Sequence, residues 1–162
     1  MDKTTLSLSM RELMPFAENE IAAGREVLLP VKGNSMVPFL RDGRDSIYLS
    51  APKQSFHVGD LVMFRREDGS YAMHRIYQVN QDGSYDIVGD NQIACDKAIT
   101  NGMIKAFVPR AIRDGKEIDC TKGAWRFAMV VYMKLRLNHP KLTQRLMRPA
   151  SGLFKKIHNR EA

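Results

Sequence analysis

The sequence predicts a mainly β fold in which short antiparallel strands form a barrel-like body. Apolar runs follow one another from Glu26 onward, and no segment long enough for a crossover helix separates them. The turns between these runs combine Asp with Gly, a pairing that is typical of β-hairpins. We therefore expect strands over residues 27–31, 46–49, 61–64, 71–79, 85–88 and 104–112.

A helix is expected before the strands, over about Ser9 to Gly24. Apolar residues recur there near helical spacing, with acidic residues on the other faces and a glycine as the stop signal. Pro15 lies inside this pattern, and proline interrupts helical hydrogen bonding, so a start near Pro15 is the alternative. We expect this helix to pack on the sheet.

The C-terminal quarter carries the positive charge of the chain. Residues 122–162 contain 10 Lys and Arg and one acid, a net charge of +9, whereas residues 1–121 carry −2. We expect a helix from residue 122 to residue 138, broken at His139-Pro140, and then the pattern of a basic amphipathic helix. The chain thus divides into a helical segment (1–25), a β domain (26–121) and a basic helical tail (122–162).

Two interpretations of the tail remain open. A basic amphipathic helix is typical of contact with a membrane surface or a partner, but it is also compatible with a solvated helix packed on the domain. Nucleic acid is an unlikely partner, because the aromatic residues of the tail do not interleave with its basic residues as a stacking platform requires.

Several classes of protein are excluded by the composition. Cys95 and Cys120 are too few for a disulfide scaffold and lack metal-ligand spacing, so we expect reduced thiols, no metal and no cofactor. The longest uncharged apolar run, Phe127 to Met133, has seven residues, whereas roughly 20 are needed to span a bilayer. The N-terminus also lacks the pattern of a signal peptide. We expect a cytoplasmic protein, either free or peripheral on the inner membrane face.

The residues around Ser35 suggest a nucleophile. Ser35 follows an apolar run and Gly33, and it precedes Met36 and Pro38. A serine at the sharp end of a strand presents its hydroxyl at the rim of a sheet, beside backbone N–H groups that can bind an oxyanion. The alternative is an ordinary turn, since these residue types are common in turns.

A serine nucleophile needs a base, and His74 is the best candidate. His74 lies in a predicted strand, whereas His57, His139 and His158 lie in a polar loop or in the tail, and no lysine occurs within residues 54–96. A carboxylate would hold the imidazole in the required tautomer. Asp90 and Asp96 are the candidates for that role, and the alternatives are a plain turn residue and a surface acid.

Four blocks in one order resemble the signal peptidase I superfamily, the S24/S26 peptidases. His74 stands where bacterial type I signal peptidases and self-cleaving repressors carry lysine, which makes the chain similar to the endoplasmic-reticulum and archaeal branch. The resemblance covers about residues 26–112. The blocks are Gly33-x-Ser35-Met36-x-Pro38, Gly59-Asp60-Leu61-Val62-x-Phe64, His74-Arg75-Ile76, and Gly89-Asp90-Asn91 with Asp96.

This resemblance implies a partly open antiparallel β-barrel of the signal peptidase and LexA type, and an endopeptidase that works through an acyl-enzyme. It implies Ser35 as the nucleophile and His74 as the general base, with Asp96 as first choice and Asp90 as second choice to orient the base. Gly33, Met36 and Pro38 are the implied substrate-binding residues beside the nucleophile. Family members cleave after small residues in extended peptides that add a strand beside the site.

Three features depart from the family pattern. The expected fold contains no membrane anchor, Gly33 has no hydroxyl where bacterial relatives carry an oxyanion donor, and the residues before the first strand leave no room for a DNA-binding domain. The leading hypothesis is a serine endopeptidase that cleaves a peptide or precursor protein made in the same cell. The alternatives are a catalytically idle peptide-binding module and a membrane-surface adaptor that acts through the basic tail.

Overall fold

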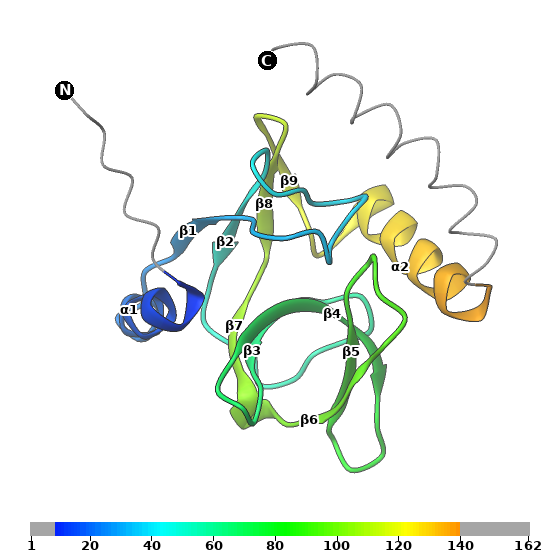
Figure 1. Cartoon of the computed structure of the whole chain (residues 1–162), viewed down its shortest axis with the longest axis horizontal. Helices are drawn as coiled ribbons and strands as arrows, with labels where there is room; N and C mark the ends of the chain where they lie inside the picture. Colours follow the sequence, from blue (N-terminus) through cyan, green and yellow to red (C-terminus); the bar gives the residue numbers. More distant parts are fainter. Residues whose placement is uncertain (1–8, 140–162) are drawn as a thin grey trace.

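The computed structural model describes residues 9–139, a mainly β body with a helix at each end (Figure 1). This part of the chain contains two α-helices, nine strands and one 3-10 turn. In chain order they are α1 (Met10–Ala22), β1 (Val27–Pro30), β2 (Ser46–Leu49), β3 (Leu61–Arg65), β4 (Tyr71–Val79), β5 (Tyr85–Val88), β6 (Asp96–Ile99), η1 (Asn101–Met103), β7 (Ile104–Phe107), β8 (Arg110–Arg113), β9 (Lys116–Asp119) and α2 (Gly123–Asn138).

The strands form two antiparallel sheets. The first has the order β1-β2-β8-β9 and the second the order β6-β5-β4-β3-β7. All strand pairs are antiparallel, and neither sheet closes on itself. The prediction of a mainly β, antiparallel and partly open fold is therefore confirmed.

The prediction of a single strand over residues 104–112 is wrong, because this segment forms two strands, β7 and β8, which belong to different sheets. β7 pairs with β3 in the second sheet, and β8 pairs with β2 in the first. The chain crosses between the sheets at Val108 and Pro109, and proline cannot donate a ladder hydrogen bond. The sequence also gave no signal for β6 and β9, whose residues are mostly polar and make no apolar run.

Helix α1 begins before Pro15, so the alternative start near that proline is wrong. Ser9 and Glu12 close a capping box, with the Ser9 N–H donating to the Glu12 carboxylate at 2.9 Å. Pro15 lies on the exposed side of the helix, where water can satisfy the carbonyl that loses its intrahelical partner. The opposite side packs on the sheets through Met14, Ala17 and Ile21.

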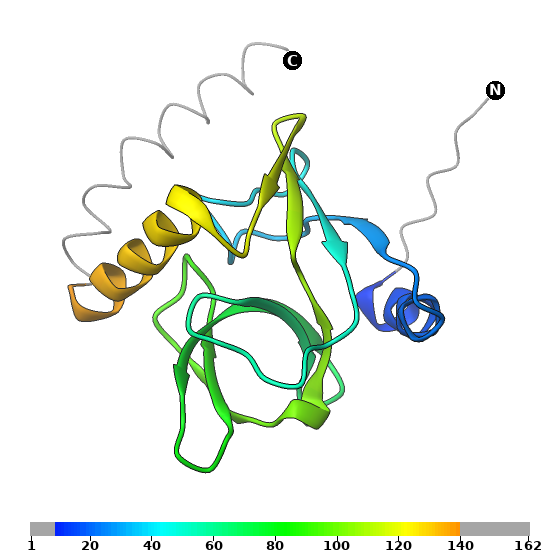
Figure 2. The same cartoon turned by 180° about the vertical axis from the view of Figure 1, so that it is seen from behind.

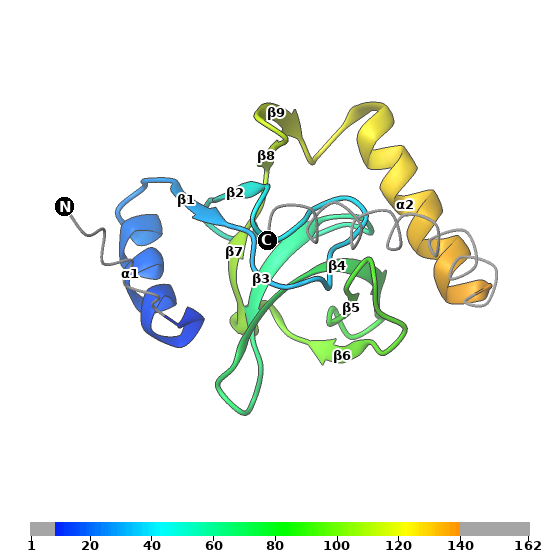
Figure 3. The ribbon, with the colours of Figure 1, turned by 45° about the horizontal axis from the view of Figure 1, so that its top comes forward.

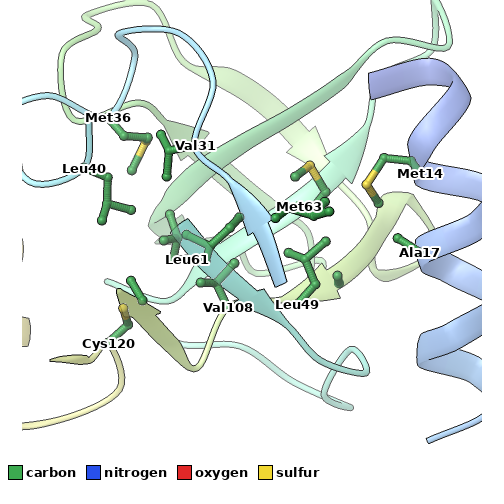
Figure 4. Close-up of a cluster of buried hydrophobic side chains, with 14 of the residues drawn as sticks. Met14, Ala17, Val31, Met36, Leu40, Leu49, Leu61, Met63, Val108 and Cys120 are labelled. Atoms are coloured by element: carbon green, nitrogen blue, oxygen red, sulfur yellow. The ribbon is translucent and has the colours of Figure 1, made fainter. Parts of the chain in front are cut away.

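The larger core cluster joins α1, the sheets and the turn that carries Ser35 (Figure 4). Met36 and Leu40 from that turn are almost completely buried, and they share this cluster with Leu61 of β3 and with Val108 between β7 and β8. Burial of two large side chains anchors the turn, because each contributes roughly 1.5–3 kcal/mol relative to an exposed position. The Ser35 turn is thus a packed part of the body.

Helix α2 confirms the helix expected over residues 122–138, and it lies at the end of the molecule opposite α1 (Figures 2 and 3). Its own residues Met129 and Met133 are buried on the side that faces the body. Phe39 of the Ser35 turn makes edge contacts with Trp125 and Tyr132, at ring-centroid distances of 5.4 and 5.2 Å. The tail expected after residue 139, including His158, lies outside the described residues.

Candidate active site

The turn that carries Ser35 is held by hydrogen bonds among its own residues. The Leu40 N–H donates to the Met36 carbonyl at 2.9 Å, and the Gly33 N–H donates to the Asp42 carboxylate at 2.9 Å. Gly33 has a φ of +77°, a conformation that residues with a side chain rarely adopt. Within residues 9–139, no group accepts a hydrogen bond from the N–H of Ser35 or Met36. These two donors are therefore available for an oxyanion.

A loop after β5 fixes this turn against the second sheet. The Asn91 N–H donates to the Ser35 carbonyl at 2.7 Å, and the Asn91 side chain donates to the Asn34 carbonyl at 3.2 Å. A Cβ atom at Gly89 would lie 2.8 Å from the Ser35 carbonyl oxygen and 3.1 Å from His74 Cδ2. Glycine therefore allows the Ser35 backbone and the His74 ring to approach the same point from two sides.

His74 of β4 is buried, with 3% of its surface exposed. Its Nδ1 atom lies 3.3 Å from Asp96 Oδ2, and its Cδ2 atom, which is bonded to Nε2, lies near Gly89, as does the Ser35 carbonyl oxygen. Burial lowers the pKa of His74 below its ordinary value of 6.5, although the charge of Asp96 opposes the shift. The imidazole is therefore neutral at pH 7 and can accept a proton.

Asp96 has a second partner in Arg66. The guanidinium donates twice to the carboxylate, at 2.6 and 2.9 Å. Burial favours a raised pKa for Asp96, but the hydrogen bond and the charge of Arg66 outweigh it and lower the pKa below its ordinary value. Asp96 is thus an ionised acceptor for a proton on His74 Nδ1.

Asp90 forms a separate, fully buried ion pair. Its two oxygens accept hydrogen bonds from Arg75 at 2.9 and 2.8 Å, and both side chains are completely buried. Arg75 also donates to the Gly59 carbonyl at 2.9 Å. Of the two acids that the sequence left open, Asp96 contacts His74 and Asp90 is bound to Arg75.

Ser35 and His74 line one cavity of about 220 Å³. The Ser35 hydroxyl makes no hydrogen bond to His74 within the described residues, and catalytic hydrogen bonds of this kind often tighten only when substrate binds. The geometry brings the serine turn, the imidazole and the orienting carboxylate together. Such a set can carry out acyl transfer.

A family model described as Peptidase S24-like matches residues 4–107. The chain belongs to the Peptidase S24-like family. The match runs from α1 through β7 and includes Ser35, His74, Asp90 and Asp96, so the resemblance to the S24/S26 peptidases is confirmed. No curated protein and no solved structure matches the chain.

The cavity of this Peptidase S24-like protein has walls that the sequence did not indicate. Most come from β1 and β4, which are far apart in the sequence, and single residues come from α1, β2 and β3. The signal that could have found the two main walls is the apolar character of β1 and β4. The apolar wall residues are Met10, Leu29, Pro30, Val31, Ile47, Met63, Tyr71, Ala72 and Met73, and the polar ones beside Ser35 and His74 are Lys32, Arg66 and Gln92.

The three residues expected to bind substrate, Gly33, Met36 and Pro38, lie in the Ser35 turn but are not among the residues that line the cavity. Met36 is 1% exposed and belongs to the core, so it shapes the turn from below and does not face the cavity. Gly33 and Pro38 are part of the turn but do not line the cavity either. Substrate binding by Gly33, Met36 and Pro38 stays a prediction, and in this structure the Met36 side chain is part of the core.

Over residues 9–139, no group of three or more His, Cys, Asp or Glu is arranged to hold a metal ion. In the same part of the chain, no helix has the length and apolar character to cross a bilayer.

Proposed function

We propose that the protein is a serine endopeptidase in which Ser35 is the nucleophile, His74 the general base and Asp96 the residue that orients the base. One observation carries this proposal. A buried, neutral His74 points Nδ1 at an ionised carboxylate and turns its other edge toward the Ser35 turn, in a cavity that both residues line.

In the proposed reaction, His74 Nε2 takes the proton of the Ser35 hydroxyl as the oxygen attacks the peptide carbonyl. The imidazolium then donates that proton to the leaving amine as the C–N bond breaks, which leaves an acyl-enzyme on Ser35. Water repeats the sequence and releases the acid. The N–H groups of Ser35 and Met36 would stabilise the oxyanion, where loss of one donor costs about 3 kcal/mol.

With His74 as the proposed base, the mechanism we propose is that of the Ser-His branch of the superfamily, the branch of the endoplasmic-reticulum and archaeal signal peptidases. The competing base would be Lys32, which also lines the cavity. Lys32 is exposed, whereas a lysine that acts as a base in proteins is typically desolvated by burial. His74 is the buried group with an orienting partner.

The substrate we propose is an extended segment of a peptide or precursor protein. β1 is the outer strand of its sheet and pairs on one side only, with β2, so its other edge can accept a further strand. The residues that follow along the chain, Val31 and Lys32, line the cavity beside Ser35. A bound strand at this edge would lead its scissile bond to the nucleophile.

A fluorophosphonate probe tests the assignment, since an activated serine attacks its phosphorus, forms a phosphonate ester and releases fluoride. We expect labelling at Ser35, located by peptide mass spectrometry, and its loss in Ser35→Ala and His74→Ala. Ser55→Ala and His57→Ala are matched controls, because both residues are exposed in the loop before β3. Labelling that persists in both active-site variants would refute the proposal.

Cleavage of a peptide library is the companion measurement, because some serine peptidases resist such probes. Wild type should cut peptides that Ser35→Ala binds but leaves intact. If both proteins bind the same peptides and neither cuts them, the groove is a peptide-binding module. The absence of a hydrogen bond from Ser35 to His74 is the observation that keeps this second function open to the test.

A further inference from the structure

Helix α2 has two chemically different sides. On the inner side, Met129 and Met133 are buried, Arg126 binds the Asp60 carboxylate at 2.6 Å, and Arg136 donates to the Asn91 carbonyl at 2.9 Å. Core packing and two arginine anchors therefore fix the rotation of the helix about its axis. The same residues of α2 therefore always face outward.

That outer side carries three large apolar residues in a row. Phe127, Val131 and Leu135 are spaced four residues apart, which places them along one face of a helix. They are 72%, 38% and 47% exposed. We call these three residues the outer stripe.

The outer stripe is unusual on this surface. Seven large hydrophobic residues are exposed within residues 9–139, and three of them belong to the outer stripe. The other four are single residues on separate elements: Phe16, Leu28, Val79 and Ile93. Single exposed apolar residues are normal, but a contiguous apolar row on a soluble surface marks an interaction site.

The charge around the outer stripe is positive. Helix α2 contains no Asp or Glu, and Lys134 is exposed beside the stripe. The sequence from residue 122 to residue 162 has a net charge of +9, whereas residues 1–121 carry −2. An apolar row beside basic residues complements a surface that has both anionic headgroups and an apolar interior.

We propose that the outer stripe of α2 docks on an anionic phospholipid membrane. The three apolar side chains would enter the boundary between headgroups and acyl chains, and the basic residues would contact the headgroups. A second copy of the chain fits less well, because a symmetric contact would bring two segments of charge +9 together. A nucleic acid offers phosphates to the lysines but no partner for the apolar row.

Docking through this face would place α2 between the lipid and the Ser35 turn. Arg136 holds Asn91, and Asn91 in turn holds the Ser35 carbonyl at 2.7 Å. Phe39 of the same turn packs on Trp125 and Tyr132. One helix therefore carries the membrane contact on its outer side and braces the Ser35 turn on its inner side. The docking itself does not depend on catalysis.

The test is flotation of the full chain with vesicles. We expect wild type to float with vesicles of phosphatidylcholine and phosphatidylglycerol, and to bind at least about tenfold more weakly to phosphatidylcholine alone. Replacing the stripe by Phe127→Gln/Val131→Gln/Leu135→Gln should weaken binding to the mixed vesicles by at least about tenfold. Glutamine preserves helix propensity, so α2 should stay folded.

Phe16→Gln is the matched control, because Phe16 is 61% exposed but lies on α1 at the opposite end of the molecule. It should float like wild type. Lys134→Glu should weaken binding to the mixed vesicles only. If circular dichroism shows that the triple variant is misfolded, this single substitution of an exposed residue still tests the proposal.

Three results would overturn the proposal. Wild type would fail to float with the mixed vesicles, or the triple variant and Lys134→Glu would both bind as wild type does. Alternatively, light scattering would show a wild-type dimer that the triple variant abolishes, which would make the outer stripe a self-association surface. Labelling of Ser35 in the triple variant reports separately on the proposed activity.

Discussion

Asp96→Asn is the sharpest test of the proposed catalytic residues, because the substitution preserves shape and removes one charge. Asp96 Oδ2 lies 3.3 Å from His74 Nδ1. In Asp96→Asn, an amide oxygen in place of Oδ1 would keep the hydrogen bond from Arg66 Nε, whereas an NH₂ group in place of Oδ2 would lose the one from Arg66 Nη2 and would face Nδ1. The proton of the imidazole would then move to Nε2, the atom that must accept the Ser35 proton.

The structure sets the expected magnitude. Two unit charges 3.3 Å apart attract by about 5 kcal/mol at an effective dielectric of roughly 20. Arg66 lies 2.6 Å from the other oxygen of Asp96 and cancels part of this attraction for a developing imidazolium. We therefore expect probe labelling of Ser35 to slow by about 10³-fold, which corresponds to about 4 kcal/mol in the barrier.

The assay is the rate constant of probe labelling at Ser35 as a function of pH. In wild type the rate should fall as the pH drops through the pKa of His74, which burial places below 6.5. Asp96→Asn should move this acid limb to lower pH, because Asp96 raises the pKa of His74. Arg66→Gln should move it to higher pH, because the Arg66 charge lowers that pKa.

Opposite shifts are the signature of the arrangement. Asp114→Asn, in an exposed turn after β8, is the matched control and should leave both the rate and the limb unchanged. If Asp96→Asn labels as fast as wild type, or if both variants move the limb in the same direction, the assigned role of Asp96 is wrong.

Three further predictions concern stability and packing. Asp90→Asn should lower the free energy of unfolding in urea by about 3–5 kcal/mol, because it leaves the buried charge of Arg75 without its carboxylate; a loss below about 1 kcal/mol would contradict the buried pair. Gly89→Ala should slow probe labelling, because its Cβ would lie 2.8 Å from the Ser35 carbonyl oxygen. Gly102→Ala is the control and should label at the wild-type rate, because its Cβ would meet no atom closer than 3.9 Å. Equal labelling rates in the two variants would refute the close approach at Gly89. The free energy of unfolding should fall as the pH drops below 6.5, because His74 in the unfolded chain binds a proton at a higher pH than the buried His74 does. His74→Gln should remove this loss of stability, which urea titrations at several pH values measure.

Much of the fold could be predicted because apolar runs and Asp-Gly turns are local signals. The exceptions have a physical reason. The apolar run from residue 104 to residue 112 spans two strands, since Pro109 interrupts the ladder where the chain changes sheets. β6 and β9 are short and mostly polar, so their pairing with neighbours defines them and their own sequence does not.

The candidate site could be predicted only in part for a related reason. Ser35 and His74 stand in recognisable blocks, but the choice between Asp90 and Asp96 depends on which arginine each acid meets. Those partners are 15 and 30 residues away in the sequence. Met36 also resembles a contact residue in the sequence, and only its packing beneath the turn shows that it belongs to the core.

The two arginine pairs explain how His74 can be a neutral base beside two acids. An unpaired carboxylate near a histidine raises the pKa of the imidazole and favours its protonated form, which cannot accept a proton from serine. Here Arg75 neutralises Asp90, and Arg66 neutralises Asp96. Burial can then dominate and keep the pKa of His74 low. Asp96 still offers one oxygen to Nδ1, so in the proposed mechanism it keeps the single ring proton on Nδ1 and leaves Nε2 free to accept the serine proton.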